Sequence, residues 1–293
     1  MSKHHTIGVI GFGVMGSGMA SNLARHGHTV LGYSRTAHKV EALASCSIAS
    51  ASLDEIAARC EVILLSLTDG SAVHSVLFGE NGLSSKLKRD TLIIDTTTIA
   101  PSEAVAAHEK AAESKLTFID APVTGGDVGA RNGTLTIMCG GTQAAYTRAL
   151  PFLECIGSRV VYVGGPGFGQ RLKAVNQVAV ALGIVAMTEA IVLSESQGID
   201  PAFAIETIQG GAAGSWALSN YAPRLFRGDF APGFSAAHML KDLRIALSES
   251  GKEGDLPGTE LSTLLFERLA KLSSDFGNHA LLKVYAHPTD SSS

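Results

Sequence analysis

Short apolar runs alternate with helix-like segments through the first half of the chain. The runs cover Thr6–Ile10, Thr29–Tyr33, residues 62–67 and Leu92–Asp95, and each is largely hydrophobic. Continuous apolar character is typical of parallel strands whose two faces are covered by helices. Residues 15–26 have helical spacing and end before a glycine. The pattern therefore predicts repeated βαβ units in an open, doubly wound parallel sheet.

Two further features extend this α/β pattern to about residue 163. Ser52 stands three residues before Glu55, and this capping-box spacing predicts the first turn of a helix. Residues 116–119 form another apolar run, which leads into Asp120. We predict a further strand there.

The character of the chain changes after the glycine-rich residues 164–167. Residues 170–197 contain no proline and one glycine and are dominated by Ala, Val, Leu and Ile, which predicts one long helix that Gly198 ends. No segment beyond it alternates as a strand does. We therefore predict a sheet domain at residues 1–165 and an all-α domain at residues 166–293, with a long interdomain helix and a polar tail at residues 289–293.

Composition narrows the class of protein. A chain of 293 residues is long enough for two domains, and its 45% hydrophobic and 17% charged residues are typical of globular proteins. The formal net charge of -4 provides no basic surface, so we expect no nucleic-acid partner. The most apolar stretch contains Asn176, Gln177 and Glu189, which favours a buried helix over a membrane span.

Cysteine and histidine usage gives no sign of a metal site. The four cysteines form no CxxC pair, and the ten histidines show no metal-ligand spacing. No signal-peptide core follows the N-terminus. We expect unpaired thiols in a reducing compartment, and hence a cytoplasmic protein.

A GxGxxG motif follows the first predicted strand and opens the first predicted helix. Its six residues are Gly11, Phe12, Gly13, Val14, Met15 and Gly16. In this context the first glycine permits a tight turn, the second lets the backbone approach a pyrophosphate, and the third allows close helix packing. Phosphates are then favoured at the helix N-terminus. The motif predicts a Rossmann-type dinucleotide site, with a purely structural loop as the alternative.

The end of the second predicted strand indicates which dinucleotide is bound. It reads Ser34-Arg35-Thr36, with no acidic residue for a ribose 2′-hydroxyl. A guanidinium holds a 2′-phosphate well, and the two hydroxyls add donors. We predict NADP, with NAD as a possible cofactor. The alternative is a solvated Arg35 that stacks on the adenine.

Three further segments carry a family resemblance. They are residues 120–126 (Asp-Ala-Pro-Val-Thr-Gly-Gly), residues 169–177 (Gly-Gln-Arg-Leu-Lys-Ala-Val-Asn-Gln) and residues 230–234 (Phe-Ala-Pro-Gly-Phe) followed by Lys-Asp-Leu at 241–243. With the N-terminal glycines, they resemble the β-hydroxyacid dehydrogenase family, which includes 3-hydroxyisobutyrate dehydrogenase and tartronate semialdehyde reductase. The resemblance extends from residue 8 to about residue 282.

The resemblance implies a catalytic role for three residues of the long helix. Lys173 matches the family's catalytic lysine, and Asn176 and Gln177 match the polar pair that follows it. A lysine fits this chemistry, because loss of a hydride from an alcohol carbon requires loss of the hydroxyl proton. A lysine pKa of about 10.4 has to fall for that role, and an apolar helix and a cation such as Lys241 would lower it. The alternative for Lys173 is a solvated surface charge.

The resemblance also implies substrate and cofactor contacts. Thr124, Gly125 and Gly126 match the family's Ser-Gly-Gly, which holds the substrate carboxylate. Lys241 matches a second lysine near the cofactor and the substrate carboxylate. Leu67 and Thr68 stand where the family usually has Leu-Pro. Thr98 and the preceding Thr97, which follow Asp95, match a Ser/Thr pair beside the nicotinamide ribose.

Several of these residues have simpler structural alternatives. Lys241 has Asp242 and Glu249 as possible surface partners, and Thr124 could cap a turn. Trp216 either lines the substrate pocket or packs in an interface. Asp95 and Asp120 end strands and are interpreted as loop-fixing carboxylates.

Together these features predict an NADP-linked 3-hydroxy acid dehydrogenase or semialdehyde reductase. The candidate substrates are 3-hydroxyisobutyrate, glycerate or its semialdehyde, serine and threonine, which the sequence does not rank. An imine reductase of the same superfamily and a non-catalytic dinucleotide-binding module are the alternatives, and Lys173 argues against both. The resemblance further implies a homodimer or homotetramer.

Overall fold

The structure is a computed structural model that describes residues 4–251, 254–273 and 276–285, so the predicted polar tail lies outside the described residues. By its internal contacts the chain divides into two units, Met1–Lys173 and Ala174–Ser293. Each unit is described by itself below.

The first unit is built on one sheet. Among the described residues, nine strands contribute to it: β1 (Thr6–Ile10), β2 (Thr29–Tyr33), β3 (Ile48–Ser50), β4 (Val62–Leu65), β5 (Leu92–Asp95), β6 (Thr117–Asp120), β7 (Val123–Thr124), β8 (Leu135–Gly140) and β9 (Gly157–Gly164). Their order is β3-β2-β1-β4-β5-β6-β8-β7, and β9 pairs with β8. The first six strands, β1 to β6, are parallel to one another. This confirms the predicted parallel sheet, whose order reverses between β1 and β4.

One edge of the sheet departs from the parallel pattern. Strand β8 runs antiparallel to both β6 and β7. Strand β7 contains only two residues, too few for a strand periodicity in the sequence. The strand predicted at residues 62–67 ends at Leu65, and the one predicted at residues 116–119 begins and ends one residue later.

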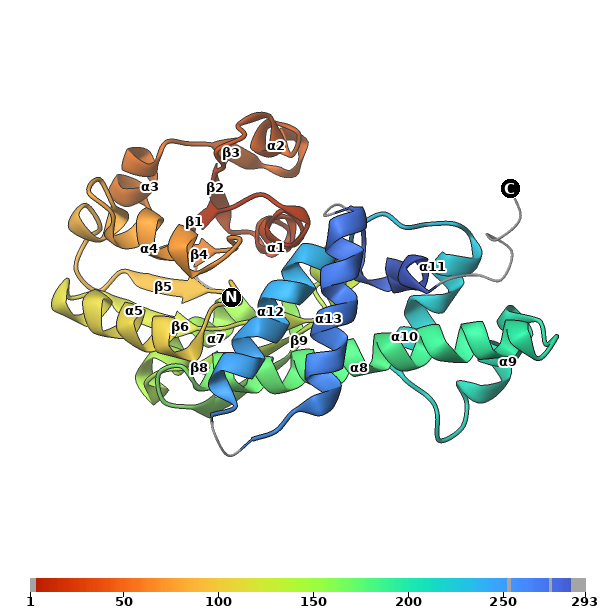
Figure 1. The fold of residues 1–293 in the computed structure, drawn as a ribbon. Coiled ribbons are helices and arrows are strands. Elements are labelled where there is room, and N and C mark those ends of the chain that lie inside the picture. The colour runs from red at the N-terminus through yellow and green to blue at the C-terminus, as the bar shows by residue number, and fades with distance from the viewer. Residues whose placement is uncertain (1–3, 252–253, 274–275, 286–293) are drawn as a thin grey trace. The chain divides into compact units, whose positions relative to one another are not determined.

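Helices cover both faces of the sheet, as continuous apolar strands require (Figure 1). They are α1 (Val14–Arg25), α2 (His38–Glu41), α3 (Leu53–Arg59), α4 (Gly70–Phe78), α5 (Pro101–Glu113), α6 (Gly126–Asn132) and α7 (Gln143–Leu153). Val62 and Leu64 of β4 join a core cluster with residues of α1, α6 and α7. Ile63 and Leu65 face the other way and join residues of α3, α4 and α5.

The capping box predicted at Ser52 is present. The Ser52 hydroxyl accepts a hydrogen bond from the Glu55 backbone N–H, and the Glu55 carboxylate accepts one from the Ser52 backbone N–H at 2.7 Å. These bonds favour the ionised carboxylate and lower the pKa of Glu55.

The second unit is helical. Helix α8 (Phe168–Ser196) begins in the first unit and continues into the second, and it ends as predicted, with Gly198 at a φ of 71°. It is followed by α9 (Pro201–Ile208), α10 (Trp216–Asn220), α11 (Ala222–Phe226), α12 (Ala236–Glu249) and α13 (Pro257–Leu272). An isolated bridge joins Ser235 to Gly277. The parallel sheet of the first unit and the helices that follow it confirm the predicted fold class, a Rossmann-type sheet domain followed by an all-α domain.

Helix α8 is also the one helix, in the part of the chain that the structure describes, that is long and apolar enough to cross a membrane by length and composition alone. Of its most apolar window, 44% is buried against the protein.

Three of the four cysteines are buried, and Cys46 is exposed. Burial disfavours the thiolate and raises the pKa of Cys60 to about 11 and that of Cys139 to about 12. Burial also raises the pKa of Cys155.

A histidine cluster lies where β1 and β2 begin. His28 is 8% exposed, its ring packs against Phe152, and its Nε2 lies 3.8 Å from Cys155 Sγ. Burial, together with the nearby His5, lowers the pKa of His28 from its ordinary value of 6.5. The folded protein therefore disfavours the protonated form of this imidazole.

The histidine cluster predicts acid sensitivity of the fold. Unfolding lets His28 take up a proton once the pH falls below about 6.5, whereas the folded state resists it, so the free energy of unfolding decreases as the pH falls from 7 to 5. His28→Phe should flatten this decrease, and the exposed His38→Gln should leave it unchanged. Melting temperatures across this pH range test the prediction; equal slopes for wild type and His28→Phe contradict it.

Candidate active site

The carboxyl ends of the parallel strands gather at one edge of the first unit. Because β1, β2, β4, β5 and β6 are parallel, the loops that follow them share that edge (Figure 1). In open α/β sheets, ligands bind at this edge where the strand order reverses, between β1 and β4 here.

The three glycines of the loop after β1 have different surroundings. Gly11 has a φ of 99°, and a Cβ there would collide with the Ser66 carbonyl oxygen. A Cβ at Gly16 would collide with the Gly11 carbonyl oxygen, so this glycine lets α1 pack on the loop. A Cβ at Gly13 would meet no atom within 4 Å. The protein's own packing therefore explains Gly11 and Gly16, but not Gly13.

The start of α1 fits a phosphate group. Helix α1 begins after Gly13 with no acidic residue in its first turn and no side-chain cap. Its first backbone N–H groups, from Val14 to Gly16, are donors that a phosphate can satisfy. The Phe12 side chain is buried under Gly32, so Phe12 would contribute only its backbone to a dinucleotide. The open position at Gly13 and this uncapped helix start fit a pyrophosphate.

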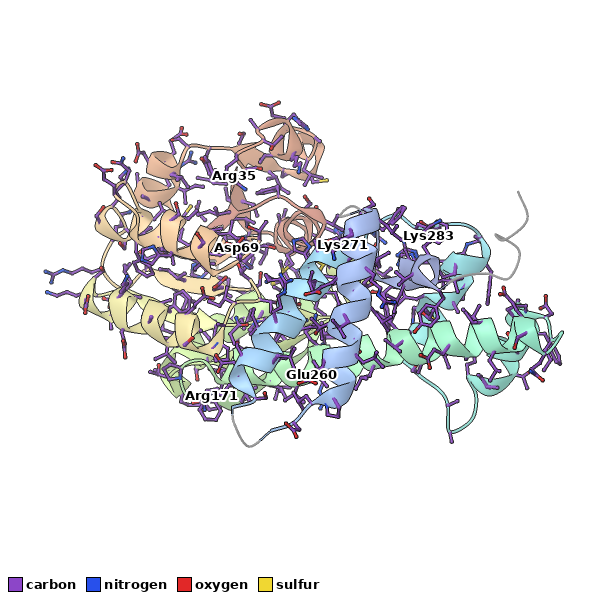
Figure 2. The ribbon with its side chains drawn as sticks, viewed as in Figure 1. Arg35, Asp69, Arg171, Glu260, Lys271 and Lys283 are labelled. Atoms are coloured by element: carbon purple, nitrogen blue, oxygen red, sulfur yellow. The ribbon has the colours of Figure 1, made fainter. Side chains whose placement is uncertain are left out.

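The loop after β2 presents the residues expected to choose the dinucleotide. Arg35 is exposed just beyond β2 (Figure 2). The Ser34 hydroxyl accepts a hydrogen bond from the Thr36 backbone N–H at 3.2 Å, which closes a tight turn around Arg35. The guanidinium is therefore presented on an ordered loop.

The loops after β4 and β5 are joined by hydrogen bonds. The Leu67 backbone N–H donates to Thr97 Oγ1 at 3.0 Å, and the Thr97 backbone N–H donates to Asp95 Oδ1 at 2.9 Å. Asp95 thus fixes the loop that holds Thr97 and Thr98. Where the family usually has proline, the Thr68 hydroxyl donates to Asp69 Oδ2 at 2.9 Å.

Asp69, which the sequence analysis did not name, fixes the end of the loop after β4. Its Oδ1 accepts a hydrogen bond from the Ala72 backbone N–H at 2.8 Å and so caps α4 (Figure 2). The capping pattern, an aspartate three residues before Ala72, was visible in the sequence.

Lys173 is buried, which excludes the solvated alternative. The residue is 4% exposed, and its Nζ donates a hydrogen bond to the Val123 carbonyl oxygen at 2.9 Å. Val123 directly precedes Thr124, so the structure brings the expected catalytic lysine to the loop expected to hold the substrate carboxylate.

The geometry of that loop requires its glycines. Gly125 and Gly126 have φ values of 122° and 65°, which only glycine adopts readily. Thr124 is half-buried on β7, and it does not cap α6, whose N-cap is Gly125. Among the described residues no hydrogen bond engages the Thr124 side chain, so its hydroxyl is available to a ligand.

Gln170 was missed as a site residue although it belongs to the helix motif. It is 1% exposed, its Nε2 donates to the Thr97 carbonyl oxygen at 2.8 Å, and its Oε1 accepts from the Ile99 backbone N–H at 3.2 Å. One amide side chain thus holds the loop after β5 against the first turn of α8.

The second unit contains its own polar chain. Gln177, 3% exposed, donates through Nε2 to Asp242 Oδ2 at 2.6 Å, and Asn176 donates to Gln177 Oε1 at 2.8 Å. Lys241 Nζ lies 3.2 Å from Asp242 Oδ1. The Lys241–Asp242 pair that we considered as a surface pair is present, but Asp242 is only 1% exposed. Asp242 therefore orients both Gln177 and Lys241, which the sequence analysis did not foresee.

Lys241 also lines a groove of about 490 Å³ along α12, formed with Ala237, Leu240, Arg244, Ile245 and Ser248. Both cations of this groove are ion-paired, Lys241 with Asp242 and Arg244 with Glu267 at 2.9 Å.

Trp216 lies at the start of α10 and is 47% exposed. Its ring packs edge-on against Tyr221, with centroids 4.7 Å apart, and Tyr221 stacks on His279. The structure therefore places Trp216 in an aromatic column of the second unit.

Metal chemistry finds no support in the described residues. No group of three or more His, Cys, Asp or Glu side chains within them is arranged to hold a metal ion. The chemistry that the described site offers is a buried amine, amides, hydroxyls and backbone donors.

Comparison with known families assigns both units. Residues 6–164 match the model of the NAD binding domain of 6-phosphogluconate dehydrogenase. Residues 167–285 match the model described as NAD-binding of NADP-dependent 3-hydroxyisobutyrate dehydrogenase.

Full-length relatives share the same pattern. An uncharacterized oxidoreductase of Synechocystis is 44% identical over 286 residues, which cover 95% of this chain and 97% of the relative. The 2-hydroxy-3-oxopropionate reductase of Escherichia coli is 36% identical over 281 residues, which cover 94% and 95%. The crystal structure of 3-hydroxyisobutyrate dehydrogenase from Salmonella typhimurium matches with a TM-score of 0.89 at 26% identity, covering 96% of this chain and 100% of that one.

The open position at Gly13 predicts a variant that separates binding from folding. Gly13→Ala adds a methyl group that meets no protein atom, and the backbone there has a negative φ, so the melting temperature should stay within about 2 °C. Dinucleotide affinity should fall about tenfold or more, because the methyl group occupies the space of the pyrophosphate. Calorimetric titration and thermal melting measure both quantities.

Gly16→Ala is the matched control. Its methyl group collides with the Gly11 carbonyl oxygen, so this variant should lose stability. Unchanged dinucleotide affinity in Gly13→Ala would contradict the assignment of the loop.

Proposed function

The chain belongs to the β-hydroxyacid dehydrogenase family of NAD(P)-dependent oxidoreductases, and we propose that it transfers a hydride between NADP and carbon 3 of a small 3-hydroxy acid, with Lys173 as the acid/base. The observation that carries this proposal is the buried Lys173 amine, which donates a hydrogen bond to the backbone carbonyl of Val123, the residue before Thr124.

The proposed reaction needs a group that moves one proton. The nicotinamide ring, when bound, accepts or supplies the hydride. In the oxidation direction, neutral Lys173 takes the proton of the substrate hydroxyl while the carbon loses its hydride. In the reduction direction, the Lys173 ammonium polarises the carbonyl and then gives it the proton. The Val123 carbonyl accepts one N–H of this amine and so holds the amine beside the loop that contains Thr124.

Substrate orientation would come from the carboxylate. The backbone N–H groups of Gly125 and Gly126, in an unusual positive-φ turn, and the Thr124 hydroxyl are suited to bind it. Asn176 and Gln177 are proposed to contact the reacting oxygen, and the hydrogen bond from Gln177 to Asp242 would hold this pair in one orientation. Lys241, paired to the same carboxylate, is proposed to contact the cofactor or the substrate anion.

The relatives support the substrate class. The reductase from E. coli acts, by its name, on 2-hydroxy-3-oxopropionate, and the Salmonella structure is that of a 3-hydroxyisobutyrate dehydrogenase. Both names describe a short acid with a hydroxyl or carbonyl at carbon 3. We propose glycerate, 3-hydroxyisobutyrate, serine and threonine as candidates, and the exposed Trp216 as a substrate contact.

The experiment that tests the proposed function is a rate assay. The absorbance of the reduced nicotinamide is followed with NADP and with NAD, for a panel of these acids and the corresponding aldehydes. Turnover of at least one member with NADP supports the proposal. No turnover of the panel, with dinucleotide binding intact and turnover of a cyclic imine, would favour an imine reductase instead.

Lys173→Ala should remove turnover and spare binding. Loss of a positioned acid/base costs about 10²- to 10⁴-fold in kcat. Lys173 contacts the Val123 carbonyl and not the loop of residues 11–16 that is expected to bind the pyrophosphate. The Kd of the dinucleotide should therefore change by less than about threefold. Stopped-flow rates and fluorescence titration measure the two effects; a kcat within tenfold of the wild type would remove Lys173 from its role.

Arg35→Ala should change the preference between the two dinucleotides. Loss of a charge-assisted contact to a 2′-phosphate costs about 1.5–3 kcal/mol, or about 10- to 100-fold in NADP affinity. NAD lacks that phosphate and should be affected by less than about threefold. The exposed Arg159→Ala is the matched control. Equal losses for NADP and NAD in Arg35→Ala would contradict the NADP assignment.

The expected cytoplasmic location and the expected homodimer or homotetramer stay predictions. Size-exclusion chromatography with light scattering tests the second.

A further inference from the structure

We infer that Asp120 is a positioning residue, which holds the first turn of α8 and thereby sets where the Lys173 amine lies. The inference rests on the proposed function, in which Lys173 carries the proton. It extends that function to a residue whose hydrogen bonds go to the start of α8 and to His108, and which therefore acts on the amine through the helix.

Asp120 serves as the cap of α8 from a distant part of the chain. The residue before the helix is Gly167, which has no side chain to cap it. Asp120 Oδ1 accepts a hydrogen bond from the Gly167 backbone N–H at 2.9 Å, and Oδ2 accepts one from the Gln170 backbone N–H at 3.1 Å. Gln170 is the third residue of the helix, where an N-cap side chain normally bonds. A carboxylate there also suits the helix dipole.

The carboxylate has no freedom to move. Asp120 is fully buried, and His108 Nε2 lies 3.0 Å from Oδ1. A Cβ added to Gly140 or Gly169 would collide with the carboxylate oxygens, so both backbones press against it. A fully enclosed group with hydrogen bonds on both oxygens fixes the start of the helix within a narrow range.

The cap and the lysine contact come from one short segment. Lys173 lies three residues after Gln170, about 4.5 Å further along the helix axis. Its Nζ bonds to Val123, three residues after Asp120. Residues 120–123 therefore hold α8 at two points, first at its start and then at the amine. If the first point loosens, the turn that carries Lys173 can shift, and a displacement of about 1 Å can cost about 10²-fold in rate.

The same turn is linked to the loop after β5. Gln170 holds the Thr97 carbonyl and the Ile99 N–H, and Thr97 is joined to Leu67. Asp120 thus fixes the lysine relative to the loops where the nicotinamide is expected, through backbone contacts rather than through a second catalytic group.

Asp120→Asn is the main test. The change keeps the size of the side chain, but one acceptor oxygen becomes an NH₂ group that faces a backbone N–H. We expect kcat per dinucleotide-binding site to fall about tenfold or more, with the Kd of the dinucleotide and the KM of the substrate within about threefold. Rates are measured well below each variant's melting temperature, and the concentration of sites comes from dinucleotide titration.

Asp200→Asn is the matched control. Asp200 caps α9 in the second unit through the Phe203 backbone N–H at 2.8 Å, and we place it outside the site. The same chemical change there should lower the melting temperature and keep kcat per site within about twofold. If Asp120 had only a structural role, Asp120→Asn would behave like this control. The number of folded sites would fall, but kcat per site would not change.

A second pair of variants tests the inference if the Asp120→Asn protein does not fold. His108→Ala keeps both bonds from Asp120 to α8 and removes the ring that braces Oδ1, and it should lower kcat per site about threefold or more; His108→Gln, whose amide N–H can replace Nε2, should restore it. If Asp120→Asn folds and its kcat per site is unchanged, the inference is wrong but the proposed function stands. If Asp120→Asn does not fold, an unchanged kcat per site in His108→Ala has the same meaning. A wild-type protein with no turnover of the whole panel overturns the proposed function and this inference with it.

Discussion

The solvation of one buried amine is the constraint on which the site depends. A lysine that is 4% exposed loses most of its water, and an unpaired charge in that position would be costly. The protein replaces part of this hydration with the Val123 carbonyl. Val123 lies on β7, which ends the strand order of the sheet and pairs with β8, so backbone groups on its other side are not needed for the sheet. The positive-φ turn at Gly125 and Gly126 follows this strand directly, so the amine and the turn lie next to each other.

The sheet supplies the precision that such an amine needs. Parallel strands with apolar residues on both faces are held by helices from two sides, so their carboxyl ends move little. The loops that follow them are then connected sideways: Leu67 to Thr97, Thr97 to Asp95, and Gln170 to Thr97. Sites mounted on rigid elements and braced by buried polar side chains keep their geometry better than sites on free loops. A family built this way can vary its substrate by changing a few contacting side chains while the proton-transfer geometry stays the same.

Much of the fold could be predicted from the sequence because its signals are local. Strands β1, β2 and β5 are short apolar runs, the capping box at Ser52 lies within four residues, and Gly198 marks the end of α8. The antiparallel pairing of β8 with β7 could not be predicted. Strand β7 has only two residues, and neither strand carries a local sequence signal for its pairing partner. Burial of Asp242 was equally hidden: a Lys-Asp pair in sequence looks like a solvated pair, and only packing shows that the carboxylate is enclosed. The motif placed Lys173 and Thr124 in one site. The contacts of Gln170 could not be predicted in the same way, because they join it to Thr97 and Ile99, which are distant in sequence.

The buried thiols described above have a consequence for the redox behaviour of the protein. Burial raises the pKa of Cys60 to about 11 and that of Cys139 to about 12, so both thiols stay protonated at neutral pH. Since the thiolate is the form that oxidants and alkylating reagents attack, these sulfurs are chemically silent in the folded state. Cys46, the exposed one, is then the single point at which a maleimide dye or a mild oxidant should react with the native chain. The protein carries a natural attachment site for a probe on its dinucleotide-binding unit, and oxidative modification of the native enzyme would be expected to begin there.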